Sequence, residues 1–395
     1  MGNGPLEGVK VIDLSVMISG PLATMVLADQ GADVIKVESP GLGDLMRYLG
    51  SSRGGMTGLF AGCNRGKRGI TIDLKHPEGV NLLRAMAATA DVFVQNFRPG
   101  ACVRLGVGPD DLRAANPGLI YVSISGFGPT GPYSNRRVYD NVIQAYSGMA
   151  GVQTDPATGT PTALRNLVCD KVTAYTAAQA ITAALFARER GAGGQHIELA
   201  MLDAAIAFLW PDAAMDRTLL EDDAMRSPTI ASGYSITPLA DGYMTATALS
   251  DSEFRGLCAA IGRPEVADDP RFATLPLRMA NLADLAPTMI EVAARTTVAD
   301  FLQGAVEHDV PAAPILGLDD LPGDPQITHN ELFVETSHPH AGRLREVRPA
   351  PRFGSTPARV SSPAPMPGEH TDAVLAELGF DDARVAELRA AGVVH

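Results

Sequence analysis

The chain is poor in cysteine, in long apolar runs and in positive charge, and each shortage excludes a class of protein. Only four cysteines occur among 395 residues, at positions 63, 102, 169 and 258, and none forms a CxxC pair. Thiols this scattered exclude a common zinc module and give no sign of a disulfide framework. No apolar run reaches the ~18–20 residues that a membrane-spanning helix needs, so we expect no membrane partner.

The charge balance is acidic, because 45 Asp and Glu residues face 32 Lys and Arg residues and leave a formal net charge of −13. Nucleic acid is therefore an unfavourable partner. A phosphorylated cofactor remains possible where a few cations gather. The start of the chain, Met1–Pro5, has no basic region followed by an apolar core, the pattern of a secretory signal. We expect a cytoplasmic protein.

Short apolar strands alternate with helical segments along the first third of the chain. Strands are expected at 9–14, 33–38, 70–74, 91–96 and 119–125, with a further one at 196–199. Such βα units predict an α/β fold with a parallel sheet and right-handed crossovers. The first turn, Ser15–Gly20, lacks the GxGxxG pattern that lets a pyrophosphate approach the backbone. A nicotinamide or flavin enzyme is therefore not favoured.

From about residue 219 the pattern changes to a smaller α+β domain, with a strand at 242–247 and helices near 251–261, 282–295 and 298–308. A β-hairpin is expected at 331–348, and two short helices are expected after residue 370. Trp210, the only tryptophan, is expected in the core. The segment Asn64–Arg68 contains three cations. Such a run usually lies on a solvated surface, although this one could face phosphates.

One aspartate stands where a short apolar run meets a long helical one. Asp170 precedes the segment Val172–Arg190, which is rich in Ala and Leu, has no Pro or Gly, and stops at Gly191. At a helix start its carboxylate could simply be an N-cap that accepts from free N–H groups. The same position could also make it an ionised and aimed nucleophile. The local pattern leaves both readings open.

A series of short segments extends over nearly the whole chain: Val11–Leu14, Gly20–Pro21, Gly31–Glu38, Asn64–Arg68, Asn96–Gly100, Ser123–Gly128, Asp140 ahead of Gln144, and Gly368–Thr371. In this order and spacing they resemble the family III CoA-transferases, a family that includes formyl-CoA and carnitine CoA-transferases and the related α-methylacyl-CoA racemases. The resemblance implies an acyl-CoA and a small carboxylic acid as substrates, and Asp170 as the catalytic residue.

In the family, that aspartate attacks an acyl-CoA thioester to give a mixed anhydride, which the CoA thiolate converts to an aspartyl-CoA thioester. An acceptor carboxylate then repeats the steps in reverse. No metal is needed, because the carboxylate replaces one difficult acyl transfer with several easier ones. Water must be kept out, since it would hydrolyse the anhydride.

The resemblance also implies a CoA site, made of Lys75, Asn96, Phe97, Arg98, Arg104 and Arg137. The cations match family positions that hold positive charge or contact the nucleotide, and Asn96 and Phe97 match residues that line its adenine end. Each cation could instead be an ordinary surface residue, and Phe97 could be a core aromatic. Asn96–Arg98 follow a predicted strand, where open α/β sheets bind ligands.

Tyr139, Asp140 and Ile18 are expected to line the active site. The racemases use a histidine at the position of Tyr139, whose phenol, with a pKa near ~10, is a poor base at neutral pH. Oxalate-specific members have a glutamine at Ile18 and an arginine at Ser39, and a glycine-rich lid where this chain has Thr229–Tyr234. We therefore expect a bulkier or more apolar acid. A racemase-like isomerase and a non-catalytic acyl-CoA-binding protein remain alternatives.

The family fold is an interlocked homodimer, in which each chain has a large Rossmann-like domain built from both termini and a small domain between them. By this resemblance, residues 1–200 and 351–395 form the CoA-binding domain and residues 226–315 the small α+β domain. Residues 201–225 and 316–350 are the linkers.

Overall fold

We describe a computed structural model of the chain, in which the described residues are 4–226 and 229–395. Contacts between residues divide the chain into two units. The first joins the chain up to Trp210 with His329–His395, and the second is Pro211–Thr328. Within the described residues, no helix has both the length and the apolar composition needed to cross a membrane.

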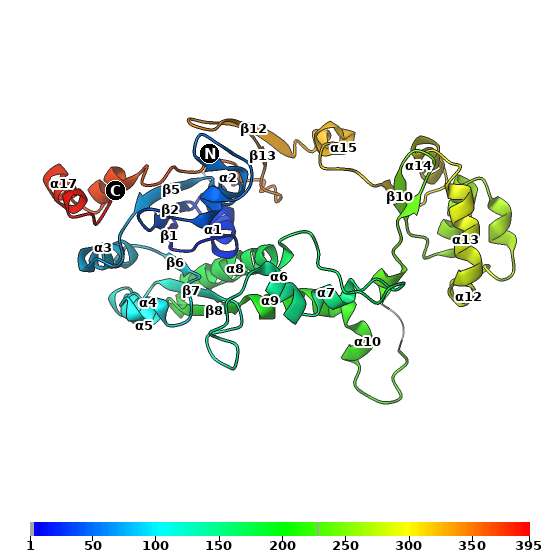
Figure 1. The fold of residues 1–395 in the computed structure, drawn as a ribbon, viewed down its shortest axis with the longest axis horizontal. Coiled ribbons are helices and arrows are strands. Elements are labelled where there is room, and N and C mark those ends of the chain that lie inside the picture. The colour runs from blue at the N-terminus through cyan, green and yellow to red at the C-terminus, as the bar shows by residue number, and fades with distance from the viewer. Residues whose placement is uncertain (1–3, 227–228) are drawn as a thin grey trace. The chain divides into compact units, whose positions relative to one another are not determined.

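A six-stranded parallel sheet forms the centre of the first unit (Figure 1). Its order is β5-β2-β1-β6-β7-β8, with β1 (Lys10–Asp13), β2 (Asp33–Glu38), β5 (Lys67–Thr71), β6 (Val92–Gln95), β7 (Ile120–Ser125) and β8 (His196–Ala200). The order reverses between β1 and β6, and open α/β sheets bind ligands beyond the strand ends at such a point. The predicted α/β class with a large parallel sheet is confirmed.

Helices cover both faces of this sheet, so alternate strand residues enter two different cores. Val11 and Val34 belong to one core, and Ile12 and Ile35 belong to the other. The helices of this unit are α1 (Ser19–Asp29), α2 (Gly58–Asn64), α3 (Pro77–Ala88), α4 (Ala101–Arg104), α5 (Pro109–Ala115), α6 (Asp140–Tyr146), α7 (Met149–Val152), α8 (Val168–Ala187), α16 (Thr371–Glu377) and α17 (Asp382–Ala390).

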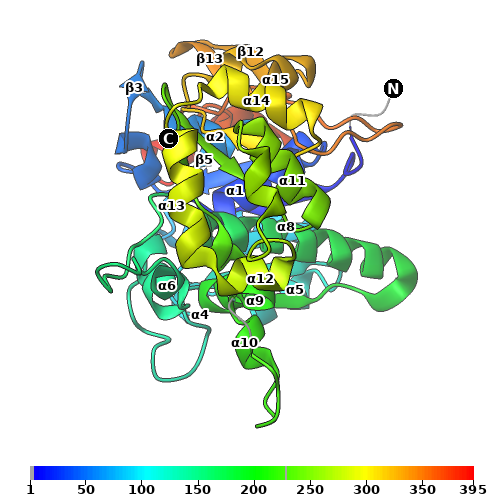
Figure 2. The same ribbon diagram turned by 90° about the vertical axis from the view of Figure 1, so that its right-hand side faces the viewer.

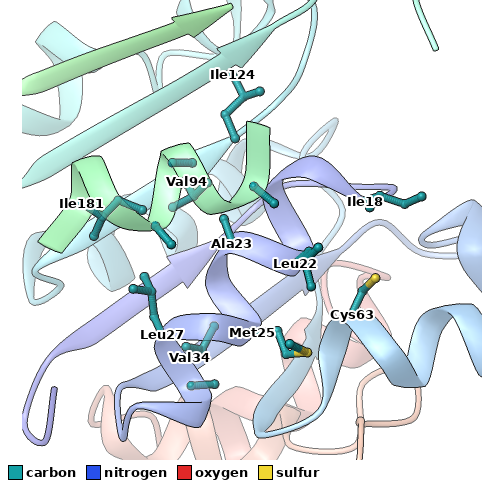
Figure 3. Packing of buried hydrophobic residues seen from close by; sticks show 14 of the residues in the cluster. Ile18, Leu22, Ala23, Met25, Leu27, Val34, Cys63, Val94, Ile124 and Ile181 are labelled. Atoms are coloured by element: carbon teal, nitrogen blue, oxygen red, sulfur yellow. The ribbon is translucent and has the colours of Figure 1, made fainter. Parts of the chain in front are cut away.

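Helices α1 and α8 pack against each other on one face of the sheet (Figure 3). Ala23 and Leu27 of α1 and Ile181 of α8 lie in the same buried cluster. The side of α8 in this core is largely alanine, and small side chains let two helix backbones approach closely. The packing holds the starts of the two helices in place.

The cation run Asn64–Arg68 is mostly buried, and its three cations pair with carboxylates of the same unit. Strand β5 begins at Lys67 rather than at Ile70, and Lys67 is 1% exposed. Its ammonium group donates to Asp13 Oδ2 and Asn64 Oδ1, at 2.8 Å each. A charged strand residue can enter the core because a buried carboxylate pairs with it.

The remaining elements of the first unit are the short pair β3 (Ser52–Arg53) and β4 (Met56–Thr57) and the predicted hairpin, with β12 (Phe333–His338) and β13 (Gly342–Val347). Helix α9 (Met201–Ala213) crosses the boundary between the units. Trp210 lies on α9 and is 48% exposed, so its prediction as a core residue is wrong. It is the last residue of the first unit before the boundary.

The second unit combines a three-stranded antiparallel sheet with several helices, which are drawn from lime green to yellow in Figure 2. Its elements are α10 (Met215–Thr218), β9 (Thr237–Pro238), β10 (Tyr243–Ala246), α11 (Asp251–Ala260), α12 (Leu275–Ala280), α13 (Leu282–Ala293), α14 (Val298–Glu307), β11 (Ala312–Pro314) and, at its end, α15 (Pro325–His329). The predicted strand and the three predicted helices of this region are confirmed. Phe301 is fully buried at the centre of its core.

Candidate active site

Asp170 lies in the first turn of α8 and does not cap the helix. The helix begins at Val168 with Leu167 as its N-cap, and no side chain of the N-cap residue accepts a hydrogen bond. The N–H of Asp170 donates to Asp140 Oδ2 at 3.0 Å. The prediction of a helix that starts after Asp170 is therefore wrong. A carboxylate thirty residues earlier satisfies one of the free N–H groups, and the side chain of Asp170 is left available.

Asp170 opens into a cavity of about 680 Å³ that lies entirely within the first unit. We call it the Asp170 cavity. Its lining residues are Met17, Ile18, Leu45, Tyr48, Leu49, Leu59, Tyr139, Asp140, Asn141, Gln144, Leu164, Arg165, Asn166, Leu167 and Asp170. The structure thus brings the predicted residues Ile18, Tyr139, Asp140 and Asp170 together around one space, between the starts of α1 and α8.

A buried amide fastens the segment that leads into α8. Gln144 Nε2 donates to Asp140 Oδ1 at 2.6 Å and to the carbonyl oxygens of Leu164 and Asn166 at 3.2 and 3.0 Å. Gln144 Oε1 accepts from the N–H of Leu164 at 2.9 Å. Asp140 and Gln144 are each 2% exposed. The approach to Asp170 is therefore held by one side chain that also orients Asp140.

The electrostatics of the site favour a basic carboxylate. Burial, and to a lesser extent the nearby charge of Asp140, together raise the pKa of Asp170 to about 7. No cation is among the causes of this shift. Two carboxylates that share a site resist ionising together. Near neutral pH Asp170 is thus divided between a protonated form and an ionised, nucleophilic form.

The turn between β1 and α1 forms the wall of the cavity opposite Asp170's helix and is held from several sides. Met17 has a left-handed backbone with φ of 62°, and its N–H donates to Asp44 Oδ1. Asn96 accepts from the N–H of Val16 at 2.9 Å and donates to its carbonyl at 2.7 Å. Buried Lys36 pairs with Asp44 at 3.1 Å. A non-glycine residue keeps this conformation only where its surroundings enforce it.

The predicted CoA residues are spread over the surface around the site. Phe97 and Arg98 line a separate cavity of about 180 Å³ beyond β6 and β7. Lys75, Arg104 and Arg137 are exposed, and none of them lines the Asp170 cavity. The observed role of Asn96 is to fasten the turn at Val16. The CoA contacts of all these residues stay predictions.

Sequence reasoning missed most of the apolar wall and the residues that support the site. Leu45, Tyr48 and Leu49 lie in or beside a short 3-10 turn, Leu45–Tyr48, within a stretch that looked irregular. The stretch is otherwise rich in Gly, Ser and Arg. The apolar side chains within it were the only local feature that could have indicated a cavity wall. Nothing local marks Gln144 as a clamp, because the segment that it holds, at Leu164 and Asn166, lies twenty or more residues away.

The chain matches the model of CoA-transferase family III over residues 6–371. It is 37% identical to a succinate–glutarate CoA-transferase of Agrobacterium fabrum, over 95% of this chain and 96% of that protein. It is 35% identical to a human succinyl-CoA:glutarate CoA-transferase, over 99% and 90% of the two chains. The crystal structure of a CAIB/BAIF family protein from Brucella suis superposes with a TM-score of 0.84 at 34% identity, covering 95% of this chain and all of that one.

Proposed function

Because the chain belongs to CoA-transferase family III, we propose that it moves CoA from an acyl-CoA donor to a free carboxylic acid at Asp170. The observation that carries the proposal is a carboxylate with a pKa of about 7 that opens into an apolar cavity. The two relatives, named as succinate–glutarate and succinyl-CoA:glutarate CoA-transferases, support the reaction class.

In the first half-reaction, ionised Asp170 attacks the thioester carbonyl of the donor. A C–O bond forms, the C–S bond breaks, and CoA leaves as its thiolate. The thiolate then attacks the aspartyl carbonyl of the anhydride, the donor acid leaves as a carboxylate, and Asp170 carries CoA as a thioester. The acceptor carboxylate reverses these steps and restores the Asp170 carboxylate. Each step is a nucleophilic acyl substitution.

The residues around Asp170 prepare it for these steps. Asp140 holds the backbone N–H of Asp170 and so fixes where its side chain begins. The field of Asp140 also makes Asp170 a stronger base, and nucleophilicity generally rises with basicity. The apolar walls contributed by Ile18, Leu45 and Leu59 favour an acyl chain over water beside the anhydride.

The CoA nucleotide is assigned, in this proposal, to Lys75, Asn96, Phe97, Arg98, Arg104 and Arg137 of the large domain. Four of these residues, Lys75, Arg98, Arg104 and Arg137, are exposed cations on an acidic chain, which suits a phosphorylated ligand. The same proposal includes the interlocked homodimer expected from the family resemblance. Sedimentation or light scattering of the purified chain tests that assembly.

Intact-mass measurement with a panel of acyl-CoA donors tests the reaction. We expect the protein to gain the mass of CoA less one water, and Asp170→Ala to gain nothing. A panel of donors that leaves the mass unchanged contradicts the proposal, as does an adduct that persists in Asp170→Ala.

The isomerase alternative lacks support at this site. Tyr139 occupies the position of the racemase histidine and is 64% exposed. None of the residues that line the Asp170 cavity, all of them within the described parts of the chain, is a histidine. Solvent deuterium entering the α-carbon of a 2-methylacyl-CoA, with no acceptor acid present, would revive the alternative.

A further inference from the structure

One charged group in the Asp170 cavity has no role in the steps above. Apart from Asp140 and Asp170, the lining is apolar or uncharged except for Arg165, which is its only Lys or Arg among the described residues. The two carboxylates repel an anionic substrate. A single cation in the same cavity therefore largely determines where the negative charge of the substrate can bind.

Arg165 is uncommitted in the described chain, because no hydrogen bond or ion pair joins its guanidinium to another described residue. Other arginines of the first unit are used within the protein: Arg47 pairs with Glu38 and Arg65 with Asp29. Arg165 does not compensate the charge of Asp170 either, since no cation is among the causes that set the pKa of Asp170. Its five N–H groups are therefore available to a ligand, in the fork that suits a carboxylate.

The backbone on both sides of Arg165 is fixed. Its neighbours Leu164 and Asn166 are both hydrogen-bonded to the buried amide of Gln144. Asn166 also accepts from the N–H of Val168, which begins α8. A guanidinium mounted on a fixed backbone loses less freedom on binding than one on a mobile loop.

The positions of Arg165 and Asp170 set a length for the ligand. They are five positions apart in the chain, so their Cα atoms are at most about 18 Å apart. Both line one cavity of about 680 Å³, a size typical of small-molecule sites. Between them the walls are mainly leucine, with Met17 and Ile18. A ligand that fills this space has a reactive carboxyl group at Asp170, an apolar middle, and an anionic end.

We propose that Arg165 binds the second carboxylate of a dicarboxylic substrate whose first carboxyl group reacts at Asp170. The assignment rests on the proposed function and adds the substrate class and the residue that selects it. Arg165 is thus a specificity residue, and it takes no part in the making or breaking of bonds.

The test compares how fast two donors load CoA onto Asp170, followed by intact mass. The donors are glutaryl-CoA and the CoA thioester of monomethyl glutarate, which has the same chain without the distal charge. Because the CoA portion is identical, its contacts cancel in the ratio of the two loading efficiencies. We expect the native protein to favour glutaryl-CoA roughly ten- to hundredfold, the range for a hydrogen-bonded charge pair.

In Arg165→Gln the ratio falls toward one, and in Arg165→Lys it is partly kept, since an ammonium group retains the charge and loses the fork. Arg343→Gln removes an exposed arginine of the hairpin outside the cavity and keeps the native ratio. A native ratio near one overturns the inference, and so does a ratio that Arg165→Gln leaves unchanged.

Equal weakening of both donors in Arg165→Gln also overturns the inference, because the guanidinium would then serve the CoA phosphates. If neither donor loads the native protein, the proposed function itself fails, and this inference fails with it. If both donors load the native protein equally well, the proposed function stands and only the role of Arg165 fails.

Discussion

Two groups of buried charge lie close to the start of α1, and they are built on opposite principles. In the first, Asp13, Lys36, Lys67 and Asp44 alternate in sign and are each at most 1% exposed. Burial alone would raise the pKa of Asp13, but Lys67 and Lys36 outweigh it and hold that pKa at about 2. In the second group, Asp140 and Asp170 have the same sign. No cation is among the causes that raise the pKa of Asp170.

The difference separates structural charge from reactive charge. The alternating group satisfies every carboxylate with cations and fastens strands β1, β2 and β5 to each other. The like-charged pair leaves Asp170 poised between its two protonation states beside an open cavity. On the proposed function, buried charge marks the reactive site only where the compensating cation is missing.

The largest expected effect falls on catalysis at the like-charged pair. Asp170→Asn keeps the shape of the side chain and removes the nucleophile, so CoA transfer should fall on the order of 10⁴-fold or more. Steady-state transfer with the best donor and acceptor measures it. Circular dichroism of the variant serves as the folding control, and a loss below tenfold would place the chemistry elsewhere.

The second effect concerns the alternating group. Lys67→Met removes the cation that pairs with the buried carboxylate of Asp13, and breaking such a pair costs about 3–5 kcal/mol of stability. Urea unfolding gives the value. The matched control is Arg263→Met, which removes an exposed ion pair with Glu265 and should leave the midpoint nearly unchanged. Equal stability of the two variants would show that the buried network is not structural.

A smaller and opposite effect on stability is expected at Asp170. Its pKa is raised to about 7 in the fold, against an ordinary value of about 3.8, so the ionised form is disfavoured by folding. That penalty is absent below pH 4, grows between pH 4 and pH 7, and is complete above pH 7. Asp170→Asn should therefore stabilise the protein by on the order of 2 kcal/mol at pH 8 and by little at pH 4. Thermal unfolding at the two pH values measures this difference, and equal shifts at both would contradict it.

The smallest effect is a displacement of the pH profile. Loading of Asp170 by a donor should rise about tenfold per pH unit below pH 7 and level off above it, because the ionised form attacks. Asp140→Asn removes the second cause of the raised pKa, so the midpoint should move to lower pH while burial keeps it above the ordinary value. A midpoint that stays in place would mean that Asp140 acts only through its hydrogen bond to the Asp170 N–H.

Much of the fold could be read from the order of residues. Alternating apolar strands and helices predict the parallel sheet, and the turn around Pro339–Ala341 predicts the hairpin. These features follow from neighbours along the chain, where side-chain periodicity is decisive. The exception is β5, where Lys67 and Arg68 look like surface residues. Their partners Asp13 and Asp33 lie more than thirty residues away and become visible only in the folded chain.

The candidate site shows the same limit. Asp170, Asp140, Tyr139 and Ile18 could be named from a family resemblance, and the structure places them around one cavity, although their roles stay predictions. Local pattern alone left Asp170 as either a cap or a nucleophile. The structure places Leu167 at the N-cap, and Asp140, thirty residues earlier, accepts from the N–H of Asp170. No periodicity encodes such a contact.

The most direct test of the account follows an oxygen atom. Protein already loaded with CoA receives an acceptor acid with ¹⁸O at both carboxyl oxygens, and the peptide that contains residue 170 is weighed after a single turnover. If the acceptor forms an anhydride with Asp170 and CoA then attacks the acceptor carbonyl, one labelled oxygen remains on the Asp170 side chain. We predict one heavy oxygen at Asp170 per loaded chain. Production of the new acyl-CoA with no label at Asp170 would contradict the account.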